Sequence, residues 1–162
     1  MELVRGGVLI VTTVLLGLIS GLFYTYTVSV LVSLRTVDDR TFVDVMQRIN
    51  RDIQNPRFFL SFIGSLLFLI LSLLLFVGVD GDVVLPVLIS LVFYVLSFGT
   101  TIGGNVPMNV RLDRRGDPDR IADLAGARKE FEARWTRLNT LRGLFSTVAM
   151  ATMCWALIEF GG

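Results

Sequence analysis

Four stretches of the chain are long, apolar and almost free of charge, and they constrain the fold more than any other feature. They cover about residues 6–34, 58–79, 83–102 and 141–160 of a chain of 162 residues. A helix needs roughly 20 apolar residues to cross a hydrocarbon core of about 30 Å. With 53% hydrophobic residues, the chain is also too apolar for an ordinary soluble domain. The pattern predicts a single transmembrane domain, residues 1–162, with four spans.

The expected architecture is all-α, because helices satisfy their own backbone hydrogen bonds in lipid. We predict an integral membrane four-helix bundle with up-down-up-down topology. The first connector, residues 35–57, has apolar residues at helical spacing and ends at Asn55-Pro56, so it is expected to form an amphipathic helix on the cytoplasmic side. Asp117 followed by Pro118 is a typical helix start, and nothing interrupts the sequence before Gly143. The fourth helix is therefore predicted to be long, beginning near residue 118.

Basic residues are concentrated in the two connectors. The first holds five arginines, and the second, with the start of the fourth span, holds nine of the 15 Lys and Arg residues. The only other one is Arg5. By the positive-inside rule, both connectors are expected in the cytoplasm and both termini outside, in a plasma (inner) membrane.

Several kinds of site are excluded by what the chain lacks. It has no histidine, a single cysteine at Cys154, and no carboxylate in the interior of any span. Metal centres built on imidazole or paired thiolates and nucleophilic triads are thereby excluded, and no nucleotide-binding motif is present. A proton-coupled pump is also disfavoured, since it needs ionisable groups within the membrane. We expect no metal, no cofactor and no nucleic-acid partner.

Polar residues gather where the third span ends and the fourth begins. The stretch after the third span contains Gly103, Gly104 and Pro107, which are expected to end that helix and prevent its continuation. Arg142 is expected to lie against the carbonyl end of that helix. Two interpretations are open: a polar lock between helix ends, or the floor of a pocket for a planar or lipid-like ligand. Trp135 is then an interfacial anchor or a stacking wall. The candidate ligand-binding residues are Asn105, Asn109, Trp135, Asn139, Arg142 and Tyr24.

Three segments resemble a known family. "MQRINRDIQNPRF" before the second span, "NVPMN" after the third and "RWTRLNTLR" before the fourth are similar to the anthrone oxygenase-like family of small four-helix membrane proteins. Its characteristic positions would here be Asn50, Asn55, Pro56, Asn105, Pro107, Asn109, Trp135, Asn139 and Arg142. The resemblance implies oxidation of anthrones to anthraquinones by molecular oxygen without a metal. Such chemistry needs a base and donors for an oxyanion, and this chain offers amide and guanidinium donors.

Three functions remain open from the sequence. The first is a membrane protein that binds a hydrophobic molecule or lipid, or serves as an accessory subunit of a larger membrane complex. The second is a cofactor-independent, anthrone oxygenase-like enzyme acting on a hydrophobic aromatic substrate. The third is a transporter, which would need a homo-oligomer because four helices rarely enclose a path alone. The lipid bilayer is an expected partner in each case.

Overall fold

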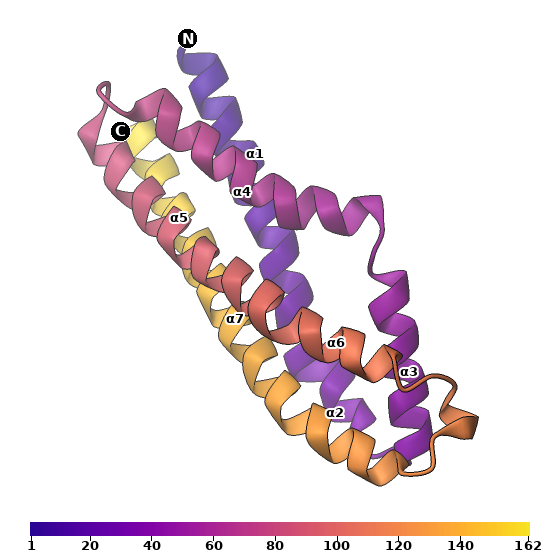
Figure 1. Ribbon diagram of the computed structural model, residues 1–162. Helices are drawn as coiled ribbons and strands as arrows, with labels where there is room; N and C mark the ends of the chain where they lie inside the picture. Colours follow the sequence, from indigo (N-terminus) through magenta and orange to yellow (C-terminus); the bar gives the residue numbers. More distant parts are fainter.

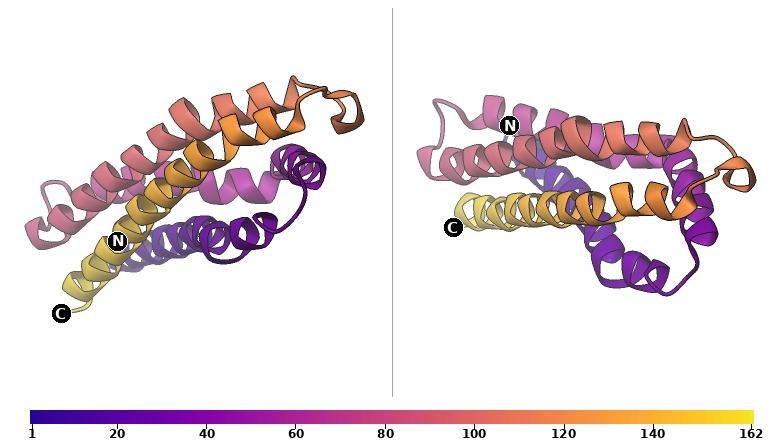
Figure 2. Two further views of the ribbon diagram at one scale, coloured as in Figure 1. Left: turned by 90° about the horizontal axis from the view of Figure 1, so that it is seen from below. Right: turned by 60° about the horizontal axis from the view of Figure 1, so that its bottom comes forward.

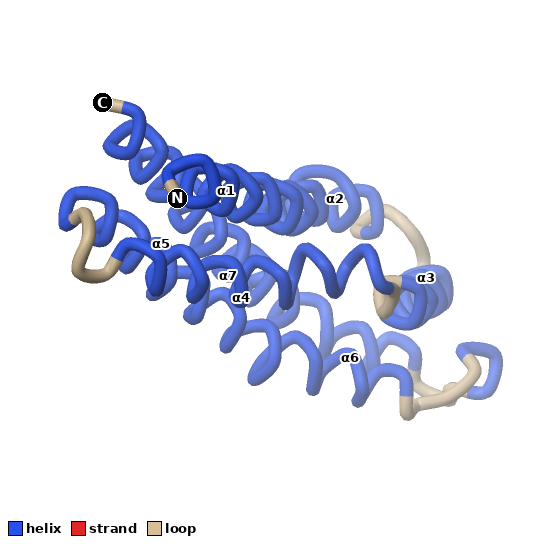
Figure 3. The backbone as a smooth tube through the Cα atoms, turned by 90° about the horizontal axis from the view of Figure 1, so that it is seen from above, coloured by secondary structure: helices blue, strands red, loops and turns tan.

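The computed structural model describes all residues 1–162 and is entirely helical, with short loops (Figures 1 and 3). The helices are α1 (Glu2–Thr25), α2 (Leu31–Leu34), α3 (Asp39–Asp52), α4 (Pro56–Phe76), α5 (Gly81–Thr100), α6 (Val106–Asp113) and α7 (Leu124–Gly161). Two π-helical turns, η1 (Tyr26–Val30) and η2 (Thr101–Asn105), join α1 to α2 and α5 to α6 without a break. A short 3₁₀ helix, η3, covers Pro118–Arg120.

Four helical runs are long and apolar enough to cross a membrane, which confirms the predicted membrane fold. They cover Glu2–Leu34, Pro56–Phe76, Gly81–Asp113 and Leu124–Gly161. Many large apolar side chains on them remain exposed, for example Leu18, Leu67 and Leu74, as a lipid-facing surface requires. The chain is therefore built as an integral membrane protein. The up-down-up-down order relative to a bilayer stays a prediction.

The long helices pack side by side around one apolar core. Its fully buried members include Leu16 and Phe23 of α1, Leu69 of α4, Tyr94 of α5 and Met153 of α7. The start of α1 lies beside the end of α4, where the Arg5 Nε donates to the Leu75 carbonyl at 3.1 Å.

Small hydroxyl side chains tie helices together inside this core. On α5, the hydroxyls of Ser90 and Ser97 donate to the α7 carbonyls of Ala149 and Arg142, at 2.8 Å and 2.9 Å. These bonds fix α5 along α7, and the two helices run side by side over much of their length (Figures 1 and 2).

The connector end of the molecule has a second apolar core. It is formed mainly by Leu34, Phe42, Met46, Leu112 and Phe131. Helix α3 runs across the direction of the long helices and covers this end (Figure 2). It begins where the Asp38 side chain accepts from the Thr41 backbone N–H, and α4 begins where Asn55 caps the N–H groups of Arg57 and Phe58. The prediction that the first connector forms an amphipathic helix is thus confirmed.

The third helical run is longer than predicted. Gly103, Gly104 and Pro107 do not end it, because the π-helical turn η2 carries the helix into α6 and on to Asp113. In η2 the Val106 N–H donates to the Thr101 carbonyl, five residues earlier. This wider turn leaves room for the Pro107 ring, which would otherwise clash with the preceding turn.

The fourth long helix starts later than predicted. Asp117 and Pro118 begin the short helix η3, in which the Asp117 carboxylate accepts from the Asp119 N–H. The chain then leaves helical geometry at Ile121, and α7 begins at Leu124 with Asp123 as its cap, accepting from the Gly126 N–H. Asp123, and not Asp117, is therefore the cap of the fourth long helix.

Candidate functional site

Two π-helical turns face the same segment of α7. Asn105, in η2, donates from Nδ2 to the Trp135 carbonyl at 3.3 Å. Thr27, in η1, accepts from Asn139 Nδ2 at 3.0 Å. One turn of α7, from Trp135 to Asn139, therefore contacts both irregular segments. Such π-bulges are frequent at functional sites because they displace side chains from regular helical positions.

Asn139 lies at the centre of a buried hydrogen-bond network. Its Nδ2 also donates to the Phe23 carbonyl at 3.1 Å, and its Oδ1 accepts from Arg142 Nε and Nη2 at 3.2 Å and 2.8 Å. The guanidinium carbon of Arg142 lies 4.0 Å from the centre of the Phe23 ring and 5.3 Å from that of Trp135. Arg142 was expected against the carbonyl end of the third helix; it lies instead between these rings and Asn139. The network forms a polar lock between α1 and α7.

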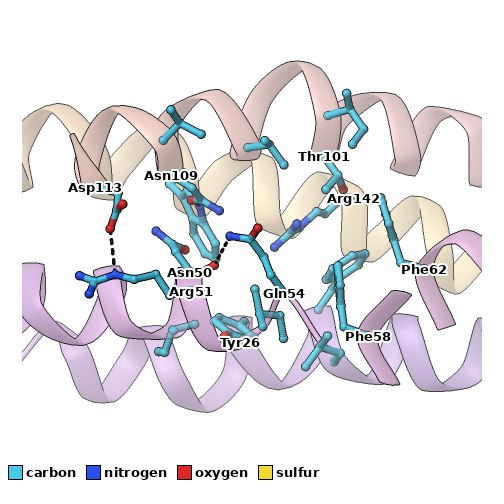
Figure 4. A pocket seen from close by; sticks show the side chains of 18 of the residues that line it. Tyr26, Asn50, Arg51, Gln54, Phe58, Phe62, Thr101, Asn109, Asp113 and Arg142 are labelled. Carbon is cyan, nitrogen blue, oxygen red and sulfur yellow. Dashed lines mark hydrogen bonds and ion pairs between the residues drawn. The ribbon is translucent and has the colours of Figure 1, made fainter. Parts of the chain in front are cut away.

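A cavity of about 490 Å³ lies beside this lock (Figure 4). Its wall is mostly apolar and is built from α1, η1, α3, α4, η2, α6 and α7. Its polar members are Tyr26, Asn50, Arg51, Gln54, Thr101, Asn109, Asp113, Arg114 and Arg142, and its apolar members include Phe23, Phe58, Phe62, Ile102, Val106 and Trp135.

Three of the six predicted ligand-binding residues line this cavity: Asn109, Trp135 and Arg142. The Trp135 indole N–H donates to Asn109 Oδ1 at 2.7 Å, so the two side chains hold each other in place. Tyr26 packs against the Trp135 ring at a centroid distance of 5.8 Å. Trp135 is only 2% exposed and thus forms a wall of the cavity, not an anchor at the membrane surface.

The other three predicted residues do not line the cavity. Asn105 and Asn139 are completely buried in the helix contacts next to it. Tyr24 is 63% exposed on the outer surface of α1, so the structure does not bring it to the site. Tyr26 lines the cavity instead, since it follows the cavity residue Phe23 by three positions on one helix face.

Helix α3 contributes wall residues that are not among the six predicted ligand-binding residues. Asn50 is 6% exposed, and its Nδ2 has no hydrogen-bond partner in the protein. Gln54 donates from Nε2 to the Asn50 carbonyl at 2.9 Å. A signal was present for Asn50, since it follows Val43 and Met46 at steps of three and four along the buried face of α3. A polar side chain on the buried face of a helix needs a hydrogen-bond partner.

One edge of the cavity is charged. Arg51 Nε donates to Asp113 Oδ1 at 3.0 Å and joins α3 to the end of α6. Figure 4 shows this pair at one end of the cavity, away from Arg142. The buried Gln47 strengthens the same contact by donating to the Leu112 and Gly116 carbonyls, both at 2.9 Å. No spacing in the sequence relates Arg51 to Asp113, so only the fold could reveal the pair.

A second ion pair lies farther out in the connectors. Arg40 donates to Asp119 from Nε at 2.6 Å and from Nη2 at 2.9 Å. This hydrogen bonding from Arg40 lowers the pKa of the Asp119 carboxyl below its ordinary value. Both side chains are exposed, so the pair orients the loop after α6 more than it stabilises the fold.

Comparison with known proteins places the chain in a family. The family model described as anthrone oxygenase matches residues 55–152, more than half of the chain. The chain belongs to the anthrone oxygenase family. The matched region of this family member includes Asn109, Trp135 and Arg142 but not Tyr26 or Asn50, so two parts of the cavity wall lie outside it. Searches of curated proteins and of solved structures found no match.

Proposed function

We propose that this member of the anthrone oxygenase family binds a hydrophobic molecule with a polar end in the cavity beside Arg142. The observation that carries the proposal is the cavity itself, which combines a mostly apolar wall with a few polar groups. Binding sites for small molecules usually have this composition and volumes of about 300–1,000 Å³. The aromatic wall of Phe58, Phe62 and Trp135 suits a planar ligand.

The route to the cavity is proposed to run through the bilayer. Several apolar wall residues are well exposed: Phe59 of α4 is 42% exposed, Ile102 of η2 49% and Val106 of α6 38%. An opening bordered by such residues favours a molecule dissolved in lipid over one dissolved in water.

A substitution at this opening tests the proposal. Val106→Trp narrows the opening, whereas Val95→Trp changes an exposed valine of α5 that does not line the cavity. Native mass spectrometry of the purified proteins should show a retained hydrophobic molecule in the wild type and in Val95→Trp, and its loss in Val106→Trp. Equal retention in both variants, or no retained molecule in the wild type after expression in its native membrane, would contradict the proposal.

Oxygenation of an anthrone is a second candidate function, and membership of the anthrone oxygenase family favours it. In this reaction a CH₂ group loses two hydrogens and becomes a carbonyl, with the second oxygen atom of O₂ leaving as water. A base must first remove a proton from the CH₂ group. Among the residues that line the cavity, Asp113 and Tyr26 are the candidates for that base.

The oxygenase candidate is tested by oxygen uptake and quinone absorbance with an anthrone as substrate. Asp113→Asn and Tyr26→Phe are the informative variants. Asp119→Asn is the matched control, because Asp119 is also paired with an arginine but lies outside the cavity. A wild-type rate no higher than that of buffer would refute this function. A rate that falls in Asp113→Asn but not in Asp119→Asn would support Asp113 as the base.

The distribution of arginines supports an orientation in the plasma (inner) membrane. Residues 35–57, which include α3, and residues 111–142, from the end of α6 into α7, carry 14 of the 15 Lys and Arg residues, so we place both segments in the cytoplasm and both termini outside. A single cysteine at Gly81 or at Gly116, in a Cys154→Ser background, distinguishes the two sides of the membrane. A membrane-impermeant maleimide added to intact cells should label the first position and spare the second; the reverse would overturn the orientation.

A further inference from the structure

Arg142 is a buried cation without a carboxylate partner. Arg142 is only 7% exposed, and none of the ion pairs in the protein includes it. Its charge is met only by the Asn139 Oδ1 and by the faces of Phe23 and Trp135. An amide oxygen and aromatic rings carry partial charges, and a buried ion normally requires an opposite full charge.

The cavity beside Arg142 holds unused hydrogen-bond donors. Arg142 binds Asn139 through Nε and Nη2, which leaves Nη1 without a partner in the protein. Asn50 Nδ2, on the opposite element α3, is buried and also without a partner. Figure 4 shows both side chains at the wall of the same cavity.

The protein does not supply the missing negative charge. Asp113 is the only carboxylate among the lining residues, and Arg51 already pairs with it at 3.0 Å. Arg114 adds a further positive charge to the wall. The cavity therefore combines apolar surface, unpaired N–H donors and an excess of positive charge.

We propose that the ligand of this cavity is a hydrophobic anion whose negatively charged oxygen binds Arg142. A second oxygen of the same group, or a nearby one, accepts from Asn50 Nδ2. This inference rests on the proposed function and specifies the chemical class of its ligand. The anionic oxygen belongs either to a free hydrophobic carboxylate, phenolate or enolate, or to the headgroup of an anionic lipid that reaches in through the opening near Val106.

A matched pair of fluorescent probes tests the charge. Anthracene-9-carboxylate and the neutral anthracene-9-methanol have the same ring system and differ in charge. Full-length protein in phosphatidylcholine nanodiscs is titrated with each probe, and energy transfer from Trp135 to anthracene is recorded, with empty nanodiscs as the blank. A Trp155→Phe background removes the other tryptophan, which is 39% exposed and lies outside the cavity.

Two variants separate charge from shape. Arg142→Gln removes the charge and retains a group able to donate to Asn139. Asn50→Asp preserves the side-chain shape and places a carboxylate in the cavity, and the Asn50 Nδ2 that it replaces makes no hydrogen bond. We expect the wild type to prefer the carboxylate to the alcohol by about tenfold or more, since a hydrogen bond to a charged group is at stake. Both variants should lose that preference while still binding the alcohol.

The outcomes distinguish this inference from the function on which it rests. If the wild type binds both probes equally, or if both variants retain the preference, the anion proposal is wrong and the cavity still binds hydrophobic molecules. If neither probe binds the wild type, the proposed function fails and the anion proposal fails with it.

Nanodiscs that contain phosphatidylglycerol identify the source of the anion. A fall in carboxylate affinity in the wild type alone shows that an anionic lipid headgroup competes for Arg142. An equal fall in Arg142→Gln reflects repulsion at the membrane surface, and it assigns the site to a free hydrophobic anion.

Discussion

Replacing Asn139 by leucine should destabilise the protein more than any other single polar change in α7. Asn139 is completely buried. Leucine keeps the branched shape of the side chain but replaces its amide by methyl groups, so the hydrogen bonds are lost. The Nδ2 bonds to the Phe23 carbonyl and to Thr27 Oγ1 disappear, and Arg142 loses its only acceptor side chain.

The magnitude follows from these contacts. Side-chain hydrogen bonds within membrane proteins contribute about 0.6 kcal/mol on average. A hydrogen bond to a charged group contributes about 1.5–3 kcal/mol, more so when its loss leaves the charge buried. With two bonds of the first kind and the Arg142 contact of the second, we expect the free energy of unfolding to fall by about 3–4 kcal/mol.

The assay is reversible unfolding in mixed micelles of rising denaturing-detergent content, followed by circular dichroism. Thr140→Ala is the matched control, since Thr140 is the next residue and bonds only to the Thr136 carbonyl of its own helix. For Thr140→Ala we expect the free energy of unfolding to fall by only about 0.5 kcal/mol, as is usual for substitutions at the protein surface. The double variant Asn139→Leu with Arg142→Gln should lose less than the two single losses combined, because removing Arg142 also removes the unpaired charge.

Two results would refute this reasoning. One is a loss for Asn139→Leu no larger than that for Thr140→Ala. The other is strict additivity in the double variant, which would mean that Asn139 and Arg142 act independently despite their 2.8 Å contact.

Three further predictions concern the elements around the site. Gly104→Val should destabilise the protein by about 1–3 kcal/mol in the same assay, because a Cβ at Gly104 would lie 2.8 Å from Leu138 Cδ1. Gly103→Val is the control, since a Cβ at Gly103 would meet open space. Equal losses in the two variants would contradict the close contact at Gly104. Gln47→Leu should lower the free energy of unfolding by about 2 kcal/mol, because two hydrogen bonds are lost. It should also speed hydrogen exchange at the start of the loop between α6 and α7. Unchanged exchange would show that other contacts hold this loop against α3. The hydrogen bonds from Thr41 lower the pKa of the Asp38 carboxyl, so its stabilisation of α3 is present above the ordinary pKa of aspartate and is lost as pH falls through the lowered value. Over that range the protection of the Thr41 amide against hydrogen exchange, relative to an unstructured peptide at the same pH, should fall in the wild type. In Asp38→Asn this protection should not change with pH.

Helix content and membrane location could be predicted from the sequence because both depend on local properties. Hydrophobicity summed over 20 residues decides whether a segment can cross a membrane, and each helix satisfies its own backbone. Caps are equally local, which is why Asp38 and Asn55-Pro56 mark the start of α3 and of α4 as their residue types suggest.

The site depends on geometry that no local pattern contains. In a π-helical turn the hydrogen bond spans five residues, so the side chains beyond it are displaced relative to a regular helix, which advances about 100° per residue. The turn η2 therefore lets the third helical run continue past Gly103 to Asp113. Tyr26 lines the cavity because it follows Phe23 by three residues on one face of the helix, whereas Tyr24 lies outside that face.

The sequence by itself determined that four apolar helices span a membrane and that polar groups meet where the third and fourth spans approach each other. Only the tertiary structure decided the roles of those groups. Asn105 and Asn139 became buried links between helices, whereas Arg142 and Asn50 were left with free donors at a cavity wall. The physical reason is that burial and hydrogen-bond pairing are set by the packing of α1, α3 and α7 together, and these helices are distant in the sequence.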